Sequence, residues 1–243
     1  MRREASNERT QLTKKSNQST PCNIMSNTVA KKSSAACGTS PQEGMSLYAP
    51  DGSRKYLNLG ERRRALGVMA TLDPNEALFG FTLAWTGARV SEVLALTPAS
   101  FQVERRIVAF RTLKRRRPSV REVPLPEELV EALDQRFGLR AAQLDPITAG
   151  ARLWPWRRET AWRLIKDVMR LSGVVGRPAC PRGLRHGFGV GTLQAGVPLN
   201  LVQRWLGHAR ISTTAIYADV SGPEEQAFAT RFWQMGATVE PPT

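Results

Sequence analysis

Two histidines and a tyrosine share one basic stretch in the last third of the chain. His186 and His208 are the only histidines in the sequence, and Arg182, Arg185 and Tyr217 accompany them. A single histidine usually has a structural role, but the arginines around these two favour a chemical one. Guanidinium groups stay charged and grip phosphate oxygens with a fixed fork of donors. The group is therefore a candidate for acting on a phosphate.

The charge of the whole chain indicates the same kind of partner. Its formal net charge is +14, and its pI is about 10.8. Such a balance is typical of a protein that meets a polyanion, because neutralised phosphates release condensed counterions. Solubility through positive charge is the plainer alternative. A membrane surface fits less well, since no basic amphipathic helix or lipidation signal stands out, and no apolar run approaches the ~20 residues of a spanning helix.

The cysteines indicate a reducing compartment and no metal centre. Cys22, Cys37 and Cys180 are odd in number, widely spaced and without a C-x-x-C pair. That pattern favours neither a disulfide framework nor a zinc cluster. No apolar segment follows the basic N-terminus as a secretory signal would require. We therefore expect a protein of the reducing cytoplasm.

Two sequence boxes resemble the tyrosine recombinase (phage integrase) family. The segment GLRHGFGVGTLQAGVPLNLVQRWLGHARISTTAIYADV is similar to the family signature, with Arg185 as its second arginine and His208 in its L-G-H element. Tyr217 follows that histidine by nine residues, as the family pattern requires. Upstream, TGARVSEVLALT places Arg89 as the first arginine and Glu92 as the supporting acid. The resemblance spans roughly residues 56–233.

The resemblance implies a fold and a reaction. The fold is mostly α with a small antiparallel β-sheet. In the reaction, Tyr217 attacks a DNA phosphodiester, forms a 3′-phosphotyrosine and frees a 5′-hydroxyl. Arg89, Arg185 and His208 stabilise the extra negative charge of the phosphorane, the kind of preorganised stabilisation that commonly dominates catalysis. A phenol with an ordinary pKa of about 10 needs help to lose its proton. No metal and no cofactor are implied, because the phosphotyrosine conserves the bond energy.

A basic turn between two predicted strands supplies the candidate acid. In the family, a lysine on this hairpin protonates the leaving oxygen. Lys114 is the only lysine between Lys55 and Lys166, and arginine is a poor acid at neutral pH. Alternatively, Lys114 is one more phosphate contact. We assign DNA contacts to Arg115, Arg116, Arg117 and Arg210.

One position departs from the family pattern. Arg182 stands where the family has the histidine that is thought to take the proton of the tyrosine, and arginine is poorly suited to that task. Related type IB topoisomerases carry a lysine there, so Arg182 is also interpreted as stabilising the phenolate by its charge. His186 is expected to support the site through a hydrogen bond behind it.

Hydrophobic periodicity predicts the elements that must position these residues. The two strands cover 101–111 and 121–125 and form a hairpin. Trp154, Trp156 and Trp162 are expected in the core, although base stacking is the alternative. The predicted helices cover 57–71, 75–96, 127–137, 160–171, 182–195, 199–206, 213–217 and 224–233.

The two ends of the chain differ in kind. Residues 1–44 are rich in Ser, Thr, Asn and Lys without apolar periodicity, so we expect a disordered tail. Residues 45–243 form the catalytic domain, and no separate core-binding domain is expected. Phe228, Phe232 and Trp233 make an apolar stripe on the last helix. It is interpreted as an oligomer contact within a tetramer on double-stranded DNA; docking on its own domain is the alternative.

Three functions remain open at this stage. The leading hypothesis is a site-specific recombinase of a bacterium or mobile element. A type IB topoisomerase-like enzyme would share the cleavage chemistry but relax supercoils. A DNA-binding regulator that has lost recombination would bind DNA without forming a covalent complex.

Overall fold

A computed structural model describes residues 46–111, 119–220 and 223–236. The polar tail at 1–44 and the basic turn with Lys114 and Arg115–Arg117 lie outside the described residues. Within the described part, the fold is mostly helical with one small antiparallel sheet, as predicted. None of the described helices is both long and apolar enough to cross a membrane.

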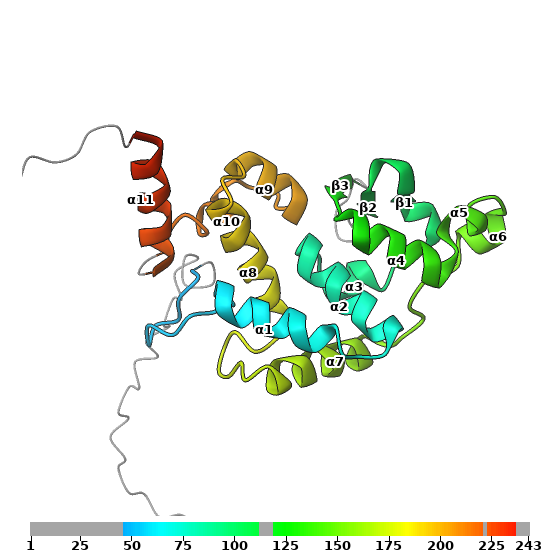
Figure 1. The fold of residues 1–243 in the computed structure, drawn as a ribbon, viewed down its shortest axis with the longest axis horizontal. Helices are drawn as coiled ribbons and strands as arrows, with labels where there is room; N and C mark the ends of the chain where they lie inside the picture. Colours follow the sequence, from blue (N-terminus) through cyan, green and yellow to red (C-terminus); the bar gives the residue numbers. More distant parts are fainter. Residues whose placement is uncertain (1–45, 112–118, 221–222, 237–243) are drawn as a thin grey trace, which may run out of the picture. The chain divides into compact units, whose positions relative to one another are not determined.

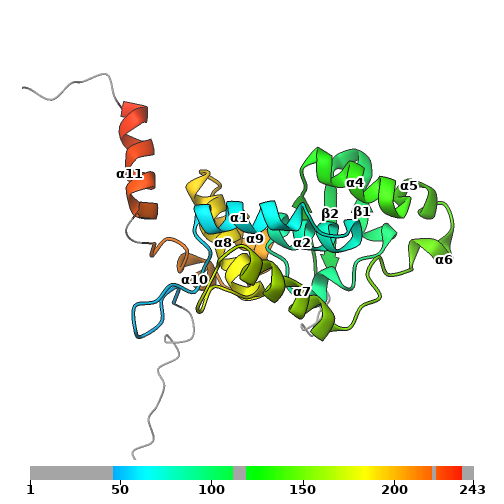
Figure 2. The ribbon, with the colours of Figure 1, turned by 60° about the horizontal axis from the view of Figure 1, so that its bottom comes forward.

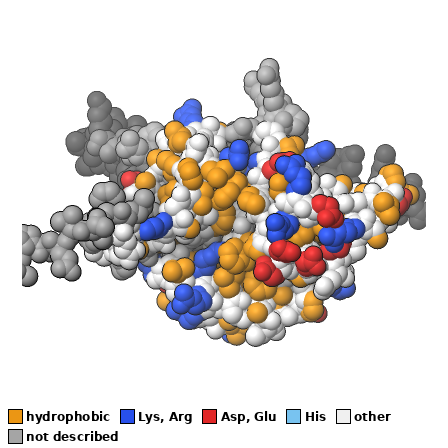
Figure 3. Space-filling view, turned by 45° about the horizontal axis from the view of Figure 1, so that its top comes forward, with side chains coloured by type: hydrophobic (Ala, Val, Ile, Leu, Met, Phe, Trp, Pro, Cys, Tyr) orange, Lys and Arg blue, Asp and Glu red, His pale blue; other side chains and the backbone are white. Residues whose placement is uncertain are grey.

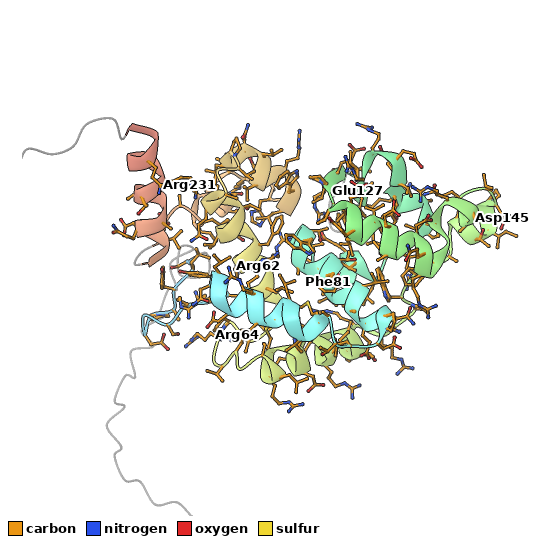
Figure 4. The ribbon with its side chains drawn as sticks, in the orientation of Figure 1. Arg62, Arg64, Phe81, Glu127, Asp145 and Arg231 are labelled. Carbon is orange, nitrogen blue, oxygen red and sulfur yellow. The ribbon has the colours of Figure 1, made fainter. Side chains whose placement is uncertain are left out.

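Four helices pack against one another and build most of the core (Figure 1). They are α1 (Leu59–Met69), α2 (Pro74–Thr86), α7 (Arg158–Leu171) and α8 (Pro181–Gln194). Asn58 and Glu61 form a reciprocal capping box at the start of α1, which satisfies two otherwise unpaired amides. Arg64 of α1 donates to the Ser172 carbonyl at the end of α7 at 2.9 Å, and Figure 4 shows its place on α1.

The sheet lies beside α3 (Val90–Val93) and α9 (Leu199–Leu206). Its strands are β1 (Phe101–Gln102), β2 (Ile107–Arg111) and β3 (Val120–Pro124), paired antiparallel in the order β1-β2-β3. Alternate residues of β3 are buried, with Arg121 and Val123 pointing inward. The predicted hairpin is confirmed, and Val108 faces Val123 across it.

Smaller elements complete the described chain (Figures 1 and 2). Helix α4 (Glu127–Phe137) packs on α2, and α11 (Pro223–Gly236) contacts α8. Short helices that the periodicity missed are α5 (Leu139–Ala142) and α6 (Pro146–Ala149), because four residues are too few to show a helical period. Helix α10 (Ser212–Ala215) follows α9.

Two predicted elements were wrong in their continuity. The single helix expected over 75–96 is two helices, because Gly87 adopts a left-handed φ of +59° and ends α2. A Cβ at Gly87 would lie 2.5 Å from the Phe188 ring, so the break also allows close packing on α8. The strand expected over 101–111 is interrupted by a turn at Arg106, whose φ is +53°.

Two of the three tryptophans that were expected in the core lie in it or against it, and the third does not. Trp154 is buried and Trp156 packs partly buried against the core. Trp162, by contrast, keeps 46% of its surface exposed. The inward face of α7 consists of Ala161, Ile165, Val168 and Met169, and Trp162 lies about 100° around the helix from Ala161.

A buried ion pair joins the sheet to the helices. Arg121 of β3 donates to both Glu92 carboxylate oxygens, at 3.2 and 2.7 Å, and both residues are about 95% buried (6% and 5% exposed). The Arg121 Nε donates to the Trp205 carbonyl of α9 at 2.8 Å, and the guanidinium lies 4.7 Å from the Phe110 ring centre. One side chain thus connects β3 with α3 and α9.

Two glycines of α8 test how closely this helix is packed. A Cβ at Gly187 would lie 2.8 Å from the Leu57 carbonyl oxygen, whereas a Cβ at Gly191 would meet nothing within 4 Å. Gly187→Ala should therefore lower the unfolding free energy by about 1–3 kcal/mol through overpacking. Gly191→Ala should raise it by up to about 1 kcal/mol through helix propensity. Urea denaturation measures both; equal effects of the same sign would contradict the packing.

The Glu92–Arg121 pair should govern stability in acid. Burial alone would raise the pKa of Glu92, but the hydrogen bonds and charge of Arg121, with the Arg89 amide, outweigh it and lower the pKa. The stabilisation is thus present above the unfolded-state pKa and is lost as the pH falls through the folded-state value. Glu92→Gln should cost about 3–5 kcal/mol at pH 7, because Arg121 loses its buried counterion.

Denaturant unfolding of wild type and Glu92→Gln at pH 7 and pH 4 checks this expectation. The difference in unfolding free energy between the two proteins should be smaller at pH 4 than at pH 7. Glu127→Gln is the matched control, because Glu127 pairs with Arg106 on the surface, with side chains 64% and 54% exposed, and exposed pairs contribute little. A difference in unfolding free energy that does not change with pH would contradict the lowered pKa of Glu92.

Candidate active site

Arg185 lies in the middle of the site and is only 8% exposed. It projects from α8, and its Nη1 donates to the Gly87 carbonyl at 2.6 Å while Nη2 donates to the Leu206 carbonyl at 2.7 Å. These carbonyls stand at the C-terminal ends of α2 and α9, where helix dipoles are negative and favour a cation. Burial first, and then the charge of Arg89, lower the pKa of Arg185 to about 10, so it stays charged at neutral pH.

His208 is held between Arg185 and Thr214. Gly207 ends α9 with a φ of +68° and turns the chain so that His208 follows directly. Its Nε2 lies 3.1 Å from the Arg185 Nη2, and its Nδ1 lies 2.9 Å from the Thr214 Oγ1. Guanidinium nitrogens only donate, so Nε2 accepts and the ring hydrogen is assigned to Nδ1. Burial, followed by the charges of Arg185 and Arg89, lowers the pKa of His208 to about 3.

Arg89 presents a more open guanidinium beside this pair. It is the N-cap of α3, where its amide donates to Glu92 at 2.8 Å and its Nη1 donates to the same carboxylate at 2.9 Å. Its side chain is 49% exposed. Arg89 and Arg121 therefore share Glu92 as a counterion. Sequence reasoning missed Arg121, although its phase with Val123 in a strand that alternates buried and exposed residues was a usable signal.

Tyr217 lies flat on α8 with none of its surface exposed. A Cβ at Gly189 would stand 2.7 Å from the phenol ring, so only glycine leaves room for it there. The hydroxyl lies 3.1 Å from the His186 Nδ1, and the ring is nearly parallel to that of His208, with centres 6.2 Å apart and an angle of 12°. Burial raises the pKa of Tyr217 to about 12, against the opposing charges of Arg185 and Arg89.

The other predicted site residues are placed differently. The Arg182 side chain is exposed and makes no hydrogen bond or ion pair with another described residue. Arg210 is exposed on the segment that follows His208. Lys114 and Arg115–Arg117 lie outside the described residues. In the described ranges, no three His, Cys, Asp or Glu side chains gather as metal ligands would.

A polar hollow of about 260 Å³ opens beside His208. Its lining residues come from β3, α9 and the segments next to them, and they include two guanidiniums and no carboxylate: Ser119, Arg121, Asn200, Gln203, Arg204, Gly207 and His208. Acidic side chains gather elsewhere, on the side of α4 (Figure 3). An anion would therefore meet positive charge at the hollow.

Comparisons with known proteins show the family of the chain. The model of the phage integrase family matches residues 67–223. Tyrosine recombinase XerD of Yersinia pestis is 33% identical over 142 residues, covering 56% of this chain and 46% of the relative. Tyrosine recombinase XerC of Agrobacterium fabrum is 31% identical over 185 residues, covering 74% and 57%. The chain thus spans about half the length of these curated relatives.

Solved structures share the fold. The crystal structure of XerA recombinase matches with a TM-score of 0.60 and 25% identity over 76% of this chain and 66% of that one. The Tn1549 transposon integrase, solved in complex with transposon right end DNA, matches with a TM-score of 0.54 and 18% identity over 77% and 68%. With a family model covering well over half of its residues, the chain belongs to the phage integrase family.

Proposed function

We propose that this chain is a site-specific DNA recombinase that cleaves and rejoins DNA through a covalent bond to Tyr217. The observation that carries the proposal is the position of the phenol, whose ring faces His208 in parallel at 6.2 Å while His208 contacts Arg185 at 3.1 Å. A nucleophile thus adjoins a group of donors suited to a phosphate. The relatives named tyrosine recombinases support the same reaction.

The arginines have donors left for a phosphate. A guanidinium carries five N–H groups, and Arg185 uses three of them, on the Gly87 carbonyl, the Leu206 carbonyl and His208. Its Nε–H and one Nη1–H are left for a phosphate oxygen. Arg89 uses one side-chain N–H on Glu92 and is the more exposed of the two. Together they form a clamp for two phosphate oxygens.

His208 needs a second proton to donate to a phosphate. In the DNA-free arrangement, its Nε2 accepts from Arg185. A phosphate next to the ring would raise the pKa of His208, because an adjacent negative charge favours the imidazolium. His208 therefore becomes a phosphate donor only when DNA is bound.

The buried phenol sets a condition on cleavage. Tyr217 has no exposed surface and belongs to a small cluster with Leu47, Tyr56 and Val202. A phosphodiester therefore reaches the hydroxyl only after Tyr217 or the side chains packed around it move. Attack then gives a 3′-phosphotyrosine, and Lys114 protonates the departing 5′ oxygen in the role that the sequence predicts for it.

The remaining assignments extend this proposal to the whole chain. Residues 45–243 act as the catalytic domain, and 1–44 form a polar tail. Arg115–Arg117 and Arg210 contact the DNA backbone. The acidic surface of α4 (Figure 3) faces away from the DNA, because like charges would repel there.

We also propose that the enzyme acts as a tetramer on paired DNA sites. The apolar stripe Phe228, Phe232 and Trp233 on α11 supports a protein contact. Arg231 on the same helix (Figure 4) reaches the turn at Gly196, where a Cβ would lie 3.3 Å from its Nη1. Helix α11 therefore also contacts its own domain.

Covalent trapping tests the reaction. Wild type and Tyr217→Phe are mixed with nicked DNA from the ends of the element that carries the gene, with a chelator present. A DNA-linked band on a denaturing gel is expected for wild type and is absent from the variant, because only the phenol oxygen can attack. Retarded DNA on a native gel without a covalent band would favour the binding-only regulator. Relaxation of a plasmid that lacks the site would favour a topoisomerase.

The stripe of α11 tests the assembly. Phe228→Ala, Phe232→Ala and Trp233→Ala together should leave single-site DNA binding in place. They should abolish complexes that hold four protein copies and two sites, as measured by native mass spectrometry. A variant that assembles normally but unfolds at a lower temperature would show that the stripe docks on its own domain.

A further inference from the structure

One face of α8 carries three residues spaced along its axis. Arg182, His186 and Gly189 stand at i, i+4 and i+7, and such positions line up on a helix. The phenol ring lies on Gly189 and points its hydroxyl toward the helix N-terminus, where it meets the His186 Nδ1 at 3.1 Å. Arg182 stands one turn farther and makes no contact with the phenol. The geometry therefore pairs the nucleophile with the histidine.

We propose that His186 accepts the Tyr217 proton during DNA cleavage and so replaces the histidine that is missing at position 182. The inference rests on the proposed recombinase function and deepens it, since it assigns a catalytic residue that touches the reacting oxygen. Arg182 takes no part in the proton transfer, because its guanidinium keeps its proton and has no acceptor atom.

The neutral charge state of His186 allows it to accept a proton. Burial first, and then the charges of Arg185, Arg182 and Lys55, lower the pKa of His186 to about 4. The ring is therefore neutral at physiological pH, and one nitrogen has a free lone pair. His208 faces the other side of the phenol at 6.2 Å, but its Nε2 is occupied by Arg185 and its Nδ1 by Thr214. Among the described residues that touch Tyr217, His186 alone offers an acceptor nitrogen directly to the hydroxyl.

The step balances without a further reactant. The Tyr217 O–H bond breaks, its proton moves to the His186 Nδ1, and the phenol oxygen forms a bond to phosphorus. The bond from phosphorus to the 5′ oxygen breaks, and that oxygen takes a proton from the acid, Lys114 in our proposal. The proton moves while the phosphorus–oxygen bond forms, since a phenol with a pKa of about 12 does not ionise beforehand. On rejoining, His186 returns its proton to Tyr217.

A substrate with a sulfur leaving group distinguishes a residue that acts as the base from one that acts as the acid. A thiol, with a pKa of about 8.5, leaves without being protonated. Lys114→Ala should therefore be slow on ordinary DNA and recover on a 5′-thio substrate. His186→Gln should lose cleavage rate by about 100-fold on both substrates, because removing a general base costs about 10²–10⁴. Arg182→Gln should lose less rate than His186→Gln on either one.

The dependence on pH gives a second readout. Without a base, only ionised Tyr217 attacks, so the rate of His186→Gln should rise about tenfold per unit between pH 7 and 9. The wild-type rate should stay level over that range. The charged and titratable groups near His186 are Arg182 and Arg185 on its own helix and Lys55, His208 and Tyr217 on neighbouring segments. All of these groups are present in both proteins, so the comparison isolates the change at position 186.

Each outcome decides the proposal. A His186→Gln variant that cleaves as fast as wild type, or faster, would overturn it and leave the recombinase function intact; faster cleavage would show that the contact only restrains a buried nucleophile. Recovery of this variant on the thio substrate would overturn it by making His186 the acid. If wild type forms no covalent band, both the recombinase function and this role of His186 are contradicted.

A measurement on the unmodified protein covers the case of a variant that does not fold. Nitrogen-15 NMR of DNA-free wild type reports which His186 nitrogen carries the hydrogen. A hydrogen on Nε2 supports the proposal, because Nδ1 is then the acceptor. A hydrogen on Nδ1 would overturn it.

Discussion

The site depends on how one buried cation is satisfied. Arg185 is almost fully enclosed, and burying a charge is costly unless hydrogen bonds compensate for the lost water. Two helices end against it, and each gives the carbonyl at its C-terminus to the guanidinium. Both ends require a left-handed residue, which Gly87 and Gly207 supply. The ends of α2 and α9 therefore place two carbonyls against Arg185. They also turn the chain so that Arg89 and His208, which come directly after these turns, lie at the site.

Close approach at α8 is the second constraint. Gly187 admits the chain that enters α1, and Gly189 admits the ring of Tyr217. A helix with three glycines in five residues (Gly187, Gly189 and Gly191) loses intrinsic stability, so its packing must compensate. Because Gly189 has no side chain, the Tyr217 ring lies close to the helix backbone. At this distance the hydroxyl contacts His186.

Local pattern predicted most of the elements, and the errors have identifiable causes. Apolar periodicity continues through Gly87 and through Arg106, so it could not show that the chain turns there; only tertiary contacts, such as Phe188 against Gly87, demand the break. Trp162 is apolar but lies off the inward stripe of α7. At the site, motif spacing brought together Arg89, Arg185, His208 and Tyr217. The contact between His186 and Tyr217 depends on how two segments pack, which spacing alone does not encode.

The cluster of site residues carries more positive than negative charge, which favours binding of an anion. Arg89, Arg121 and Arg185 lie close together, and Glu92 is the carboxylate that contacts the first two. Burial first, and then the excess of positive charge, lower the pKa values of His208 and His186 and keep both rings neutral. It also opposes, without cancelling, the burial that keeps Tyr217 protonated. A phosphate reverses this balance at His208 by favouring its charged form. In the proposed recombinase, a bound phosphate would therefore give His208 the second proton that it lacks as a donor in the free protein.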